Sequence, residues 1–189
     1  MIHEPANAEH ELRKAYNCVI DAATTFFWDR KGIPGVNPDE VVTIYKRAFR
    51  AHRDGDRLAA ERWARTAKHL SRAFQSEAKI AFLEPRTAEL PCLEGATPEE
   101  YCLTERVDAT EDLINSLADH IPHETHEISK VMEHYLRRAR RHLETLHSAD
   151  VTHELLRAEV TKAAHEYGRV LECMQLAYEA EQAHGKSAA

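Results

Sequence analysis

An uninterrupted helical pattern runs from Gly55 to Glu84 and constrains the fold of this chain more than any other feature. Its apolar residues recur at alternating steps of four and three, the spacing of one face of an α-helix. These residues are Trp63, Ala67, Leu70, Phe74 and Ala81. Glu77 alone breaks the row, and small residues such as Ala60 and Ala64 flank it. The stretch therefore predicts a long helix that packs closely in a helical bundle, with its basic face in water.

The remaining apolar segments show the same period, so we expect an all-α bundle of about six helices in antiparallel hairpins. The β-branched run from Val41 to Tyr45 resembles a strand, but it follows Asn37, Pro38 and Asp39, which are typical of a helix start. The predicted helices cover residues 7–32, 38–54, 55–84, 97–120, 124–147 and 151–185.

The size of the chain bounds its organisation. With 189 residues it is expected to form a single domain that buries its own core. Two helical halves, 7–84 and 97–185, are joined by a loop over residues 85–96, where Pro85 and Pro91 exclude a regular helix.

Cysteine usage and hydropathy predict the compartment. The four cysteines form no C-x-x-C pair, and the chain starts without a basic leader or an apolar signal core. No apolar run approaches the roughly 20 residues that cross a bilayer. We therefore expect a soluble, cytoplasmic protein that does not bind membranes.

The charge distribution predicts docking. Residues 46–79 hold ten Lys or Arg against four acids, a local charge of +6, whereas residues 84–127 hold twelve acids against two Arg, a local charge of −10. Opposite charges of this size favour docking of one half on the other or of one subunit on the next. Nucleic acid is an alternative partner of the basic helices, joined by Arg137, Arg138, Arg140 and Arg141, although the whole chain is acidic at −7.

The first helix is apolar over a broad face that includes Tyr16, Ile20 and Phe26. Such a face needs either a central position or a second subunit to cover it. Together with the length of the last helix, it predicts a dimer.

The hairpin from Tyr45 to Leu70 carries Gly55-Asp56 followed by Ala60 and Ala64, and it resembles both a tetratricopeptide hairpin and the helical hairpin of HEPN domains. No second copy follows at a period of 34 residues, so an array is not expected. HEPN ribonucleases carry an arginine and a histidine separated by four to six residues. Arg141 and His147 have that form, and the resemblance implies that His147 transfers a proton at an RNA 2′-hydroxyl while Arg141 stabilises phosphate charge.

The 13 histidines suggest a metal site as a further alternative. His123, His126 and Glu127 crowd one helix start, and Glu144-x-x-His147 places a carboxylate and an imidazole on one helical face. A di-iron bundle would need a second such pair, which is missing, and the histidines can equally be exposed loop residues. We therefore expect no bound metal.

No glycine-rich phosphate loop, Walker motif or Ser-His-Asp order is present, so no cofactor is predicted. The favoured function is a non-catalytic binding or scaffold domain, dimeric or bound to a protein partner. A HEPN-like ribonuclease or nucleotide-binding bundle is the first alternative, and a His/Glu metal-binding bundle is the second.

Overall fold

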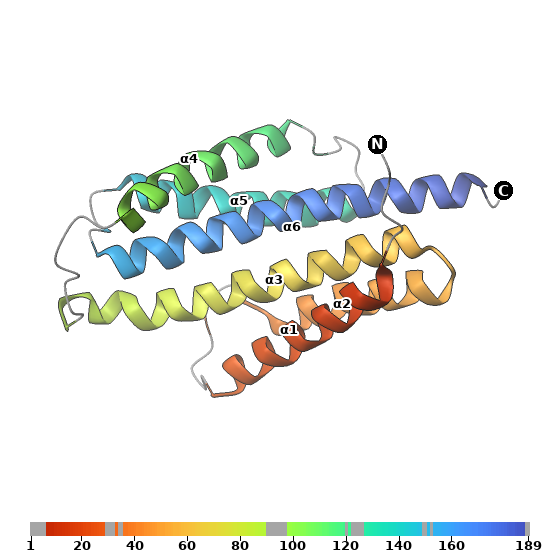
Figure 1. Ribbon diagram of the computed structural model, residues 1–189, viewed down its shortest axis with the longest axis horizontal. Coiled ribbons are helices and arrows are strands. Elements are labelled where there is room, and N and C mark those ends of the chain that lie inside the picture. Colours follow the sequence, from red (N-terminus) through yellow and green to blue (C-terminus); the bar gives the residue numbers. More distant parts are fainter. Residues whose placement is uncertain are drawn as a thin grey trace. The chain divides into compact units, whose positions relative to one another are not determined.

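The computed structural model describes residues 7–28, 33, 36–89, 98–119, 121, 127–148, 151 and 153–187. Over these residues it contains α-helices and one short 3-10 helix, with no strand (Figure 1). The elements are α1 (Ala8–Trp28), α2 (Pro38–Arg53), α3 (Arg57–Leu83), η1 (Glu84–Glu89), α4 (Pro98–Ala118), α5 (Glu127–His147) and α6 (Glu154–Ser187). The all-α prediction with six main helices is confirmed.

Polar side chains start the helices where the sequence predicts. Asn7 Oδ1 accepts from the backbone amide three residues on at 3.2 Å, and Asn37 Oδ1 accepts two residues on at 3.1 Å. Asp56 Oδ1 accepts from the third amide after it at 2.9 Å, which begins α3. Each bond satisfies one amide that has no partner inside its helix.

The turn between α2 and α3 depends on Gly55. This glycine has a φ of 87°, a left-handed conformation that residues with a Cβ adopt at a cost. The amides of Asp54, Gly55 and Asp56 bond back to the last carbonyls of α2, at 2.9 to 3.2 Å. The sharp turn predicted at these residues is therefore present, and it leads directly into α3.

The chain divides into two compact units. Unit 1 contains α1, α2, α3 up to Arg72 and α6 from Arg169, and unit 2 contains α3 from Ala73, η1, α4, α5 and α6 up to Gly168. Each unit thus combines segments from distant parts of the sequence. Their composition does not follow the two sequence halves 7–84 and 97–185.

Unit 1 has a core of small and apolar side chains beside a polar seam. The predicted row on α3 is buried from Trp63 to Leu70, and Ala60 and Ala64 are completely buried. In the seam, Glu11 of α1 lies 3.1 Å from Lys68 Nζ. Only 14% of the Lys68 side chain is exposed, which corrects the prediction that the whole basic face of α3 is in water.

Unit 2 packs α4 closely against α6 at Gly168. A Cβ at this position would lie 3.0 Å from Leu113 Cδ2 and 3.5 Å from Ile114 Cγ1. Gly168 lies inside α6, and its lack of a side chain makes room for α4. Its role is therefore close packing.

Three apolar residues whose helical spacing predicts burial are exposed. Phe49 is 56% exposed and Val131 is 36% exposed, although helical periodicity placed both inside. Ala81, at the end of the α3 row, is also exposed. A periodic pattern assigns a residue to a face, but neighbouring elements decide how much of that face is covered.

The loop predicted over residues 85–96 begins with η1, which holds Pro85 at its second residue. A 3-10 turn is compatible with the exclusion of a regular α-helix there, and residues 90–96 lie outside the described part of the chain. Among the helices that the structure describes, none combines the length and the apolar character needed to cross a membrane.

Candidate functional site

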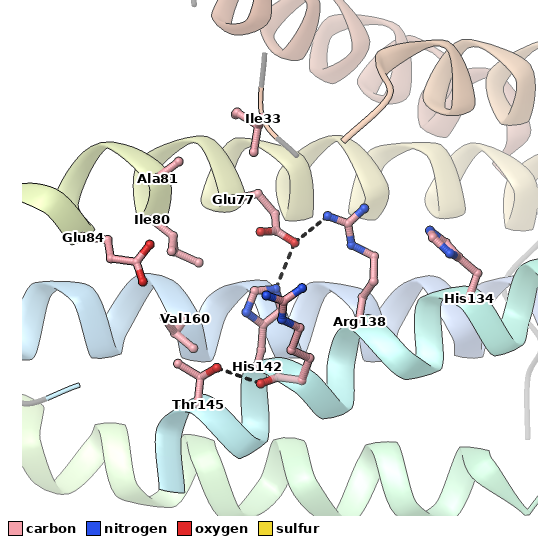
Figure 2. A pocket seen from close by; sticks show the side chains of 11 residues that line it. Ile33, Glu77, Ile80, Ala81, Glu84, His134, Arg138, His142, Thr145 and Val160 are labelled. Atoms are coloured by element: carbon pink, nitrogen blue, oxygen red, sulfur yellow. Dashed lines mark hydrogen bonds and ion pairs between the residues drawn. The ribbon is translucent and has the colours of Figure 1, made fainter. Parts of the chain in front are cut away.

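One carboxylate oxygen in unit 2 accepts three hydrogen bonds. Glu77 Oε1 lies 2.9 Å from Arg138 Nη2 and 3.0 Å from His142 Nε2. Tyr167 donates its hydroxyl to the same oxygen at 3.1 Å. Figure 2 shows Glu77 pointing from α3 toward Arg138 and His142 on α5. Glutamate, arginine, histidine and tyrosine thus form one buried group, the Glu77 cluster.

The electrostatics of the cluster favour the ionised glutamate. Burial alone would raise the pKa of Glu77, but the hydrogen bonds and charge of His142 and Arg138 outweigh it and lower the pKa to about 2. Burial and the Glu77 charge also raise the pKa of Tyr167 well above its usual value. At neutral pH Glu77 is therefore a carboxylate that only accepts hydrogen bonds.

This protonation state fixes the histidine tautomer. Because Glu77 only accepts, His142 must carry its proton on Nε2, which leaves Nδ1 without a partner among the described residues. The His142 ring stacks on Tyr167 with 5.9 Å between centroids and 11° between planes. Arg138 lies over the same tyrosine, 5.3 Å from its centroid. Stacking and hydrogen bonds hold the Arg138 and His142 side chains in one orientation.

A groove of about 370 Å³ opens beside the cluster, within unit 2 (Figure 2). One side of α5 lines it with His134, Arg138, Arg141, His142 and Thr145. Its apolar lining comprises Ile33, Ile80, Ala81 and Val160. Glu84 lines it near Ile80, and a second cavity of about 390 Å³ shares Glu84, Arg141 and Thr145 with it.

The structure separates the two residues of the HEPN-like motif. Arg141 lines the groove, whereas His147 does not. Arg141 and His147 are six positions apart on α5, so their side chains point in directions about 120° apart. His147 Nε2 lies 3.3 Å from Glu111 Oε2 of α4 instead. His147 is 59% exposed in this pair. The histidines that line the groove with Arg141 are His134 and His142.

The proposed metal ligands lie outside the described part of the chain. His123, His126 and the Glu127 side chain are not described, although Glu127 begins α5. Among the residues that are described, no three His, Cys, Asp or Glu side chains come together as a possible metal site. His134 Nε2, at the groove, is buried and has no hydrogen-bond partner there.

The four arginines of the α5 segment do not all face solvent. Arg137, Arg140 and Arg141 are exposed, whereas Arg138 turns inward and is 14% exposed. The nucleic-acid alternative therefore retains three of its four α5 arginines.

Sequence reasoning missed the Glu77 cluster, although a signal was present. Glu77 interrupts an otherwise apolar row, and a buried acid requires partners. Arg138 and His142 follow each other at a spacing of four on α5, so they share a helical face. The sequence could have indicated that Glu77 needs such a pair, but not which of many basic residues supplies it.

Unit 1 presents a second candidate surface on the hairpin of α1 and α2. Tyr16 and Ile20 on α1 are 51% and 46% exposed, and Phe49 on α2 is 56% exposed. Tyr45 joins the two helices, since its ring centroid lies 6.1 Å from that of Tyr16. Ile20 and Phe49 each lie one turn from this pair. We call these four residues the aromatic strip.

Comparisons with protein-family models, with curated proteins and with solved structures find no match to this chain. The fold and the two surfaces therefore define an all-α protein with a polar groove in one unit and an apolar strip on the other.

Proposed function

We propose that the chain is a non-catalytic scaffold that binds a second copy of itself through the aromatic strip. The observation that carries the proposal is the exposure of Tyr16, Ile20 and Phe49 on one hairpin of unit 1. Exposed apolar residues that lie together mark interaction surfaces, whereas single ones are ordinary. Aromatic residues are also enriched in interface cores.

Charges beside the strip favour a second copy as the partner. In a two-fold symmetric dimer, a residue of one copy contacts a different residue of the second copy. The same contact occurs a second time with the two copies exchanged. Such a pairing would place Ile20 on Phe49 of the second copy. It would also bring Asp21, next to Ile20, beside Arg50, next to Phe49, and both side chains are exposed. Such a pairing would thus combine apolar contacts with opposite charges.

A charge-swap series tests this dimer. Light scattering at micromolar concentration should give about twice the chain mass of 21.6 kDa for the unmodified protein. Asp21→Arg and Arg50→Asp should each weaken the dimer at least tenfold, because each places like charges opposite each other. The double variant should restore it, because it exchanges the pair without removing it.

Arg137→Asp is the matched control, since it makes the same charge change at an exposed position in unit 2. It should leave the dimer intact. A strict monomer over the whole concentration range, or a double variant no tighter than the single ones, would contradict the proposal. Failure of self-association with intact folding would instead favour a different protein partner at the strip.

A further inference from the structure

The groove of unit 2 contains two opposite charges that do not pair with each other. Arg141 and Glu84 both line the groove and the adjoining cavity, and both side chains are exposed. Neither has an ion-pair partner among the described residues. Their charges are therefore available to a ligand that carries the complementary pair.

The other charges of the groove are already compensated. Glu77 is balanced by Arg138, with which it shares a hydrogen bond of 2.9 Å. A ligand would not displace this cluster, because His142 and Tyr167 also form hydrogen bonds with the glutamate. Only one guanidinium and one carboxylate of the groove lining remain without such compensation, and the net charge offered to a ligand is close to zero.

The rest of the lining suits an apolar group. Ile80 and Val160 face the same space, with Ile33 from the segment before α2 (Figure 2). The volume of about 370 Å³ lies at the small end of ligand sites, which span roughly 300 to 1,000 Å³. A small ligand with one apolar body would fill it.

We propose that this groove binds a small zwitterion with an apolar body, of the class of α-amino acids with large apolar side chains. Arg141 binds the carboxylate, for which the guanidinium fork is suited. Glu84 binds the ammonium group, and the side chain packs against Ile80 and Val160. The Glu77 cluster holds α3 and α5 in place on either side.

The ligand chemistry can be tested with three matched probes. L-phenylalanine carries both charges, N-acetyl-L-phenylalanine lacks the ammonium group, and L-phenylalaninamide lacks the carboxylate. In NMR titrations of the full chain, L-phenylalanine should give saturable shifts at millimolar concentration around the groove. Each of the other two should bind at least tenfold more weakly.

Variants test the two residues separately. Arg141→Gln and Glu84→Gln should each weaken L-phenylalanine binding at least tenfold, and circular dichroism should show unchanged folding because both side chains are exposed. Arg137→Gln and Glu133→Gln are matched controls on the exposed face of α5, and they should bind as the unmodified chain does.

Absence of saturable binding by L-phenylalanine would overturn the proposal. So would equal binding of all three probes, or binding that neither groove variant changes. The test of ligand binding is separate from the test of the dimer, because the dimer variants change residues of unit 1 and the groove residues lie in unit 2.

Discussion

Two glutamates whose side chains are only 13% and 9% exposed, Glu77 in unit 2 and Glu11 in unit 1, differ in what surrounds them. Glu77 in unit 2 is bound by Arg138 and His142, whose side chains are only 14% and 11% exposed. Glu11 in unit 1 is about as buried, and its nearest partner Lys68 is also only 14% exposed, but its other two partners, Lys14 and Arg65, are 50% and 34% exposed. The partners, more than the carboxylate, therefore decide what a broken contact costs, because an exposed cation returns to water and a buried one does not.

The surroundings of the two carboxylates also change their pKa values. Burial alone would raise the pKa of Glu11, but the Lys68 hydrogen bond and the nearby cations lower it. The pKa of Glu77 is lowered to about 2. Both carboxylates therefore stabilise the folded chain at neutral pH.

Replacing each glutamate by glutamine should give the largest contrast. Glu77→Gln leaves Arg138 buried without a counter-charge, so the free energy of unfolding should fall by about 3 to 5 kcal/mol. Glu11→Gln should cost about 1 to 2 kcal/mol, because Lys14 and Arg65 reach water and Lys68 can extend its amine there. Urea unfolding at pH 7 measures both, and equal losses would remove the contrast.

Acid should remove the Glu77 contribution without mutation. Its folded pKa is about 2 against a usual value of 4.5, so the stabilisation is complete above pH 4.5 and is lost as the pH falls toward 2. The full shift corresponds to about 3 kcal/mol. Unfolding measured between pH 6 and 2.5 should therefore show the unmodified chain converging on Glu77→Gln, and parallel profiles would show that Glu77 titrates normally.

Packing along α6 offers a third contrast. Gly168→Val would force a branched side chain against Leu113, and we expect a loss of about 1 to 3 kcal/mol. Gly185→Val is the matched control in unit 1, because a Cβ there meets nothing within 4 Å. Thermal unfolding of both variants should show a lower melting temperature for Gly168→Val only. No effect at Gly168 would mean that Leu113 moves aside freely.

The smallest effect is expected at a solvent-exposed pair of unit 1. Arg47 donates from Nε to Glu181 Oε1 at 3.0 Å and lies over the Trp63 ring, but its side chain is 45% exposed. Arg47→Met should cost about 0.5 to 1 kcal/mol, since water replaces most of what is lost. Trp63 Nε1 keeps its hydrogen bond of 2.7 Å to the same glutamate. Urea unfolding that shows a loss as large as that of Glu77→Gln would contradict the role given to partner exposure.

Much of the fold could be predicted from local signals. Asn37 and Asp56 start helices because their short side chains reach unpaired amides, and Gly55 makes a turn because it lacks a Cβ. These effects act over a few residues, so the sequence contains them completely. The buried row from Trp63 to Phe74 is equally local, since its spacing defines one face of α3.

The candidate sites could be predicted only in part. Arg141 was identified and does line the groove, but the motif paired it with His147, which contacts Glu111. The motif depends on spacing along one helix, whereas the groove depends on which side of α5 each residue occupies. The helical spacing of Phe49 predicts that it is buried, but it is exposed. No sequence pattern shows whether another helix packs over a given face of a hairpin.

The helices, their caps and turns, and the uneven charge of the chain could be predicted from the residues alone. The contacts of Glu77 with Arg138, His142 and Tyr167 could not be predicted in this way, because these residues lie 61 to 90 positions away along the chain. Helix propensity and capping are set by neighbours in the chain, whereas the partners of a buried charge are set by which helix faces come together. That choice is made by the packing of the whole unit, in which α3, α5 and α6 each contribute one face.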